Sequence, residues 1–139
     1  MQMMDVLLVG ADAALLEGLS QSFAALGYST RVATTLHDAR EAAAESAPVL
    51  AVVERKLAGE ASAEALAIKL LGGGAMVLYH GANESRPAIP VALQRTVMAD
   101  LALPLERNRL LALAQHVQER IRTTGRASRT TPPEGQVSP

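Results

Sequence analysis

Two titratable side chains, Glu54 and His80, stand at the ends of short apolar runs and could do chemistry together. Runs of this kind predict buried parallel strands, and the carboxyl ends of such strands meet at one edge of a sheet. A carboxylate and an imidazole that met there could act as a general acid–base pair. In the alternative, structural interpretation, Glu54 pairs with the adjacent Arg55 or Lys56, and His80 fills space and makes a local hydrogen bond. The residue types alone leave both interpretations open.

Other patterns that could carry chemistry are better explained as loops, caps or surface positions. The chain has no cysteine, which excludes a thiolate nucleophile, a disulfide and a cysteine-ligated metal. His37 and His116 lie on expected helices far from His80 in the sequence, so no set of metal ligands is apparent. Gly72–Gly74 precedes an expected strand and lacks the Lys and Ser or Thr of a phosphate-binding loop. We therefore predict no catalytic residue, no metal and no cofactor.

Composition limits the class of protein and its partners. With 139 residues, 49% of them hydrophobic, the chain suits one domain with one core. The net charge of −1 and the scattered arginines argue against nucleic-acid binding, which needs a concentrated basic face. No stretch approaches the ~18 apolar residues of a membrane span. The sequence therefore predicts a cytoplasmic protein that binds neither nucleic acid nor membrane.

Apolar runs and helical patterns alternate along the chain, which predicts a parallel sheet with crossover helices. Asp12 and Thr35 are expected to cap the first two helices, and Gly27 is expected to end the first in a left-handed conformation. Strands are expected at 6–9, 28–33, 49–53, 76–79 and 98–103. Later helices are expected at 62–71, in short or distorted form within 81–97, and at 106–122.

The end of the chain differs in composition from the rest. Residues 123–139 are rich in Thr, Ser, Pro, Gly and Arg and contain almost nothing apolar. Such a segment cannot repay the entropy of its own ordering. We therefore expect one domain over residues 1–122 and a disordered tail over residues 123–139.

Four segments, at matching intervals, resemble the receiver domain of bacterial response regulators. They are Val6–Asp12, Ala47–Gly59, Met76–Gly81 and Ala102–Pro104, and the resemblance covers residues 5–122. It implies a flavodoxin-like, doubly wound α/β fold with five parallel strands in the order 2-1-3-4-5 and five helices. It also implies a role in two-component or phosphorelay signal transduction.

The residues that carry function in that family are nearly all changed here. The resemblance places the acidic pair that holds Mg²⁺ on Gly10 and Ala11, the phosphoacceptor on Glu54, the switch hydroxyl on His80, the aromatic switch on Asp100 and the lysine on Leu103. Mg²⁺ seeks oxygen ligands, which Gly10 and Ala11 offer only from their backbone. Leu103 cannot make the charge-assisted hydrogen bond of a lysine to a phosphoryl oxygen. We therefore expect a degenerate, non-enzymatic receiver that is not phosphorylated conventionally and acts by binding another protein.

The resemblance also indicates where a partner would bind. In receivers the usual partner face is formed by the fourth helix, fifth strand and fifth helix, and here it would include Ile89, Val91, Leu105 and Leu111. A signalling protein is the expected partner, and a homodimer through the same face is a second arrangement.

Three alternatives remain open at this stage. The carboxylate of Glu54 could imitate a phosphoaspartate and hold the domain in one state. The chain could instead be an enzyme or a small-ligand protein that uses Glu54 and His80 in the crevice at the strand ends. Phosphorylation by a non-standard route, on Glu54 or at another residue, is the third.

Overall fold

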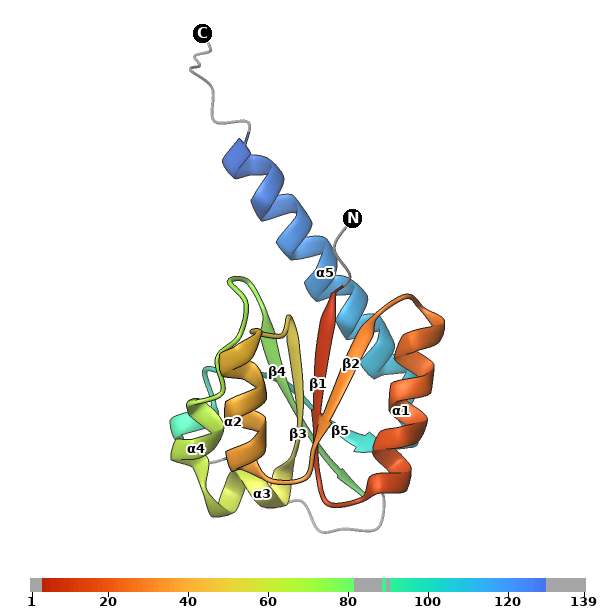
Figure 1. The fold of residues 1–139 in the computed structure, drawn as a ribbon, viewed down its shortest axis with the longest axis vertical. Helices are drawn as coiled ribbons and strands as arrows, with labels where there is room; N and C mark the ends of the chain where they lie inside the picture. The colour runs from red at the N-terminus through yellow and green to blue at the C-terminus, as the bar shows by residue number, and fades with distance from the viewer. Residues whose placement is uncertain (1–3, 82–88, 90, 130–139) are drawn as a thin grey trace, which may run out of the picture.

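Five parallel strands form one sheet with helices on both faces, in the order β2-β1-β3-β4-β5 (Figure 1). The computed structural model describes residues 4–81, 89 and 91–129. Helices α1 and α5 cover one face of the sheet, and α2, α3 and α4 cover the other (Figure 1). The predicted flavodoxin-like fold and strand order are confirmed.

The strands agree with the apolar runs of the sequence to within two residues at each end. Their bounds are β1 Asp5–Val9, β2 Ser29–Ala33, β3 Leu50–Glu54, β4 Ala75–Gly81 and β5 Val97–Leu103. The three central strands, β1, β3 and β4, are buried along almost their whole length, as expected of strands covered on both faces. Strands β2 and β5 are the two edges, and their burial patterns are accordingly broken by half-buried residues.

The α1/α5 face is closed by an apolar stripe on each helix. Helix α1 (Ala13–Ala25) buries Leu16, Leu19 and Phe23. The Asp12 carboxylate caps it by accepting the Leu15 N–H at 3.1 Å, as predicted. Gly27, with φ of 90°, makes the predicted left-handed stop.

Tyr28 ties this face to helix α5. Its hydroxyl donates to Oε1 of Gln118 at 2.8 Å, and its ring meets Phe23 edge-on. Burial raises the pKa of the Tyr28 phenol, and the charge of Arg122 opposes that shift. The buried, neutral phenol thus fixes α5 (Arg107–Arg129) across the start of β2.

The opposite face differs from the sequence expectation in its third crossover. Helix α2 (Leu36–Glu45) is capped by Thr35, as predicted, but the crossover after β3 holds two short helices, α3 (Arg55–Glu60) and α4 (Ser62–Leu66). The expected helix at 62–71 is therefore too long. Ala61 has φ of −145°, a non-helical conformation that separates the two helices. Ala65 and Ile68 are buried in place of Leu66, which is 42% exposed.

The fourth crossover is described only in part, since residues 82–88 and 90 lie outside the described residues. A short 3₁₀ turn, η1 (Val91–Leu93), follows and buries Leu93. A short or distorted helix was expected within 81–97; of that range, 82–88 and 90 lie outside the described residues, and the described part contains the η1 turn.

Helix α5 is longer than the last helix that the sequence predicted. It continues to Arg129, seven residues beyond the expected end at 122. The composition of the segment argued for disorder, but extending an existing helix adds one hydrogen bond for each residue fixed, and the first proline comes only at Pro132. The remaining part of the expected tail, 130–139, lies outside the described residues. No helix in the described ranges has the length and apolarity to cross a bilayer.

Candidate functional site

The carboxyl edge of the sheet presents different residues on its two faces. Glu54 lies opposite Tyr79 in the β3–β4 register, so these two side chains share the α1/α5 face. His80, one residue further along β4, points to the α2–α4 face because side chains alternate along a strand. The Glu54–His80 pair that the sequence left open as an alternative is therefore not formed, and the structure gives each residue a different partner.

On the α1/α5 face, Tyr79 fills the place of a side chain at position 10. An ideal Cβ built on Gly10 would lie 1.9 Å from the Tyr79 hydroxyl oxygen and 3.1 Å from its Cζ, far inside van der Waals contact. Tyr79 is 3% exposed, so its ring has little room to withdraw. Glycine at position 10 is thus explained by the close approach of a buried phenol. We call Gly10, Ala11, Glu54, Tyr79 and Leu103 the tyrosine-filled site.

Glu54 is held within this site by the backbone. Its Oε1 accepts the N–H of Ala11 at 3.0 Å, which joins the end of β3 to the β1–α1 turn. Arg55, one of the two cations expected to pair with Glu54, instead binds Asp100 on the other face of the sheet. The carboxylate of Glu54 therefore has a fixed position at the sheet edge.

The donors of the tyrosine-filled site do not fit Mg²⁺. That ion requires near-octahedral oxygen ligands, commonly carboxylates and water. Gly10 and Ala11 bring no side-chain oxygen, and Asp12 is engaged as the cap of α1. Leu103, at the lysine position, is 1% exposed within the apolar core under α1 and α5. Among the described residues of this site there is therefore neither an acidic pair nor a lysine at position 103 for phosphoryl chemistry.

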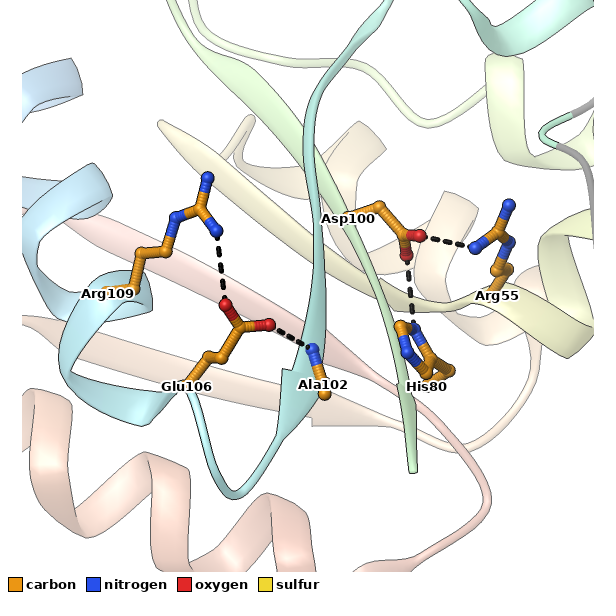
Figure 2. Close-up of polar contacts among 6 residues, drawn as sticks. All are labelled: Arg55, His80, Asp100, Ala102, Glu106 and Arg109. Atoms are coloured by element: carbon orange, nitrogen blue, oxygen red, sulfur yellow. Dashed lines mark hydrogen bonds and ion pairs between the residues drawn. The ribbon is translucent and has the colours of Figure 1, made fainter. Parts of the chain in front are cut away.

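On the α2–α4 face, Arg55, His80 and Asp100 form a buried cluster (Figure 2). Nη1 of Arg55 donates to Oδ2 of Asp100, and Nδ1 of His80 lies 3.4 Å from Oδ1 of the same carboxylate. Arg55 and His80 are each 5% exposed, and the Asp100 side chain is 13% exposed. The three come from the start of α3, from β4 and from β5. We call them the charge cluster.

Sequence reasoning placed each of these residues at the sheet edge but missed that they meet. It assigned Arg55 to Glu54, and it treated Asp100 only as a lost aromatic. The β4–β5 register would have predicted the contact. Asp100 lies opposite Leu78, and His80 is two residues further along β4, so Asp100 and His80 lie on the same face.

The turn from β5 to α5 has its own polar support on the other side of β5 from the charge cluster (Figure 2). The Glu106 carboxylate accepts the Ala102 N–H at 2.8 Å and a hydrogen bond from Nη1 of Arg109 at 3.1 Å. The Leu103–Pro104 peptide within this turn is cis. These bonds fix the point at which β5 ends and α5 begins.

The expected partner face is exposed at only two of its four named residues. Val91 is 83% exposed and Leu105 is 76% exposed. Ile89 and Leu111 are half-buried, Ile89 against the α2–α4 core and Leu111 against the α1/α5 core. Their packing explains why an apolar residue stands at these two positions without any partner.

Helix α2 carries one further group of potential metal ligands. The ligand atoms of His37, Asp38 and Glu41 lie within 4.8 Å of one another, and all three residues are exposed. The sequence analysis did not identify this group, although the residues are close in sequence. His37 and Glu41 already contact each other at 3.4 Å, a typical pairing one helical turn apart. We assign no metal site to them.

Comparison with known proteins shows the fold. No family model matches the chain, and no curated protein matches it. A response regulator receiver domain protein from Methanospirillum hungatei matches with a TM-score of 0.69 at 23% identity, over 88% of this chain and 99% of that one. A response regulator from Burkholderia pseudomallei, solved with a phosphorylated aspartic acid, a calcium ion and citrate, matches with a TM-score of 0.65 at 20% identity, over 84% and 71%.

A third solved structure has the same fold. The N-terminal domain of a response regulator/sensory box/GGDEF protein from Carboxydothermus hydrogenoformans matches with a TM-score of 0.69 at 18% identity, over 86% of this chain and 98% of that one. The chain therefore has the fold of response regulator receiver domains, from the first strand through the last helix.

Proposed function

We propose that this chain is a degenerate receiver domain of a cytoplasmic two-component or phosphorelay pathway. It acts by binding another protein, and it neither undergoes conventional aspartate phosphorylation nor catalyses a reaction. The observation that carries the proposal is the Tyr79 phenol beside Gly10, which occupies the space that an acidic side chain would need.

Three further features support a site without phosphoryl chemistry. Glu54 is one methylene longer than aspartate, and its carboxylate is already hydrogen-bonded to the backbone of Ala11. A displacement of about 1 Å at a reacting atom can reduce a rate roughly a hundredfold. The apolar Leu103 supplies no charge to a phosphoryl oxygen. Together these features oppose transfer to Glu54 by the family's usual route.

An enzyme built on Glu54 and His80 has no support in the structure. The two side chains point to opposite faces of the sheet, and His80 lies beside Asp100. A general acid–base pair requires both groups within reach of one substrate. The binding role is therefore the better explanation of the same residues.

Heteronuclear NMR with Mg²⁺ and beryllofluoride, a phosphoryl analogue, tests the loss of phosphoryl chemistry. We expect no shifts at Gly10, Ala11, Glu54 or His80 in the wild-type chain. A phosphorylatable receiver domain measured alongside confirms that the reagent is active. Saturable shifts centred on Glu54 in the wild type would overturn the proposal.

Adding carboxylates to the tyrosine-filled site, with and without Tyr79, tests whether the phenol prevents Mg²⁺ binding. The triple variant Gly10→Asp/Glu54→Asp/Tyr79→Ala removes the phenol and adds a second carboxylate beside the β3 end. We expect it to show Mg²⁺-dependent shifts, whereas Gly10→Asp/Glu54→Asp, which keeps the tyrosine, shows none. Equal responses from both variants would mean that Tyr79 does not block the site.

The partner-binding part of the proposal is tested at the exposed apolar residues. A protein captured from the native host is expected to lose binding when Val91 and Leu105 are both replaced by glutamate. Val32, which is 48% exposed on edge strand β2, provides a matched control, and Val32→Glu is expected to leave binding unchanged. Binding that survives the double change would place the partner elsewhere, and a concentration-dependent change in mass would indicate the homodimer.

A further inference from the structure

Edge strand β5 is attached to the two faces of the fold by different means. On the α1/α5 face it buries Leu101 and Leu103 in the apolar core. On the α2–α4 face its inward side chains are Val97, Asp100 and Ala102, as their register with β4 requires. Val97 and Ala102 are half-buried. Val97 packs against the apolar core of this face, and the Asp100 carboxylate contacts Arg55 and His80, each of which is 5% exposed.

The burial of Arg55 makes this attachment selective for one position of β5. A guanidinium removed from water needs an anion and hydrogen-bond acceptors to offset its lost hydration. Arg55 is 5% exposed, and its Nε has no hydrogen-bond partner among the described residues. Movement of Asp100 would therefore leave a largely buried cation without the carboxylate that offsets its lost hydration. Intermediate positions of β5 are disfavoured for the same reason.

We infer that the charge cluster is a latch that holds β5 against the start of α3 and keeps the β4–β5 side of the fold in one conformation. The inference rests on the proposed function, because it explains how a docking surface stays fixed without a phosphoryl group. The resemblance to receivers places His80 and Asp100 on the two switch positions of that family. In this chain the two positions contact each other, and Asp100 also binds Arg55.

Amide hydrogen exchange of native protein tests the latch. The measured quantity is the exchange rate in β5 and α3 divided by the rate in central strand β3, which cancels any uniform loss of stability. Breaking the cluster with Asp100→Asn is expected to raise this ratio about tenfold or more, because a local opening becomes accessible. An unchanged ratio would overturn the inference.

The opposite edge of the sheet supplies a matched control. Arg31 on β2 binds Asp5 on β1, and these side chains are 28% and 19% exposed. Asp5→Asn also breaks an arginine–aspartate pair, and it is expected to speed exchange in β2 while leaving the β5 ratio at its wild-type value. A comparable rise in the β5 ratio from this control would show that the charge cluster has no local role, and it would overturn the inference.

A milder variant keeps the test informative if Asp100→Asn does not fold. Arg55→Lys keeps the positive charge but loses the forked donor geometry of the guanidinium. We expect a smaller rise in the same ratio, at the same residues. No rise in this variant would contradict the latch.

The outcomes also separate the latch from the proposed function. A wild-type chain that responds to beryllofluoride and Mg²⁺ refutes the proposed function, whatever the exchange ratios are. If the wild-type chain shows no shifts with beryllofluoride and Mg²⁺, and Asp100→Asn and Arg55→Lys leave the exchange ratio unchanged, only the latch is refuted.

Discussion

The two faces of the sheet differ in the charged side chains that they hold at its carboxyl edge. On the α1/α5 face the tyrosine-filled site holds a glycine, a phenol and a buried leucine, and Glu54 is bonded to the backbone. On the α2–α4 face the charge cluster buries a guanidinium, a carboxylate and an imidazole together (Figure 2). The first face therefore offers few charged groups to an ion. On the second face, charged and polar side chains contact one another.

This difference indicates what kind of perturbation each face can tolerate. Apolar and neutral groups pack by shape, so a change on the α1/α5 face is felt as a steric effect. Buried charges stabilise only as complete sets, and removal of one member leaves an uncompensated charge. Substitutions on the two faces should therefore differ in size and in how a second substitution repairs them.

The largest effect is expected from Asp100→Leu. It leaves the Arg55 guanidinium buried without its carboxylate, and loss of one partner of a buried pair typically costs about 3–5 kcal/mol of unfolding free energy. Urea denaturation followed by circular dichroism measures the change.

The double variant Arg55→Met/Asp100→Leu tests whether the loss of stability comes from the unpaired charge or from lost packing. Because it removes both charges and keeps similar volume, we expect it to recover most of the stability lost by Asp100→Leu alone. Equal losses in the single and double variants would assign the effect to packing and would remove the contrast between the faces.

A smaller, steric effect is expected from Gly10→Ala in the tyrosine-filled site. The added Cβ would meet the Tyr79 hydroxyl oxygen at 1.9 Å, and forcing one extra carbon into a packed position costs about 1–3 kcal/mol. Adding Tyr79→Phe removes that oxygen and leaves the nearest ring carbon at 3.1 Å, a tight contact that small shifts can relieve.

We therefore expect Gly10→Ala/Tyr79→Phe to be more stable than the sum of the two single changes predicts. A double-mutant cycle in urea gives the interaction free energy directly. Additive losses would mean that the phenol does not define the space at position 10.

The contrast between the faces also explains what the sequence could predict. The strands follow from apolar runs at regular intervals, the strand order from the resemblance to receiver domains, and the caps at Asp12 and Thr35 from local chemistry. These features depend on residues near one another in the chain. They were predicted within a few residues.

The contacts of the site depend on register, which was not worked out from the sequence. Glu54 and His80 both lie near the end of a strand. Glu54 pairs with Tyr79, and His80 is the next residue along β4, so its side chain points to the other face and does not meet Glu54. The role of Tyr79 was missed because the sequence shows a glycine where an acid would stand and does not show the ring that fills the space. The split of the third crossover at Ala61 has no sequence signal that we recognise.

The smallest effect is expected from Glu54→Gln, and it tests whether charge at this position reaches the second face. An amide oxygen can still accept the Ala11 N–H, so the loss is that of charge assistance, about 0.5–1.5 kcal/mol at most. If Glu54 acted as a phosphoaspartate mimic, its charge would have to influence the charge cluster across the sheet. Glu54 is bonded to the Ala11 backbone, on the face of the sheet away from the charge cluster. We therefore expect chemical-shift changes confined to residues 9–12, 54 and 79, with the side chains of His80 and Asp100 unmoved. Shifts that extend through β5 in this variant, but not in the matched surface change Glu60→Gln, would show that the two faces are coupled through Glu54.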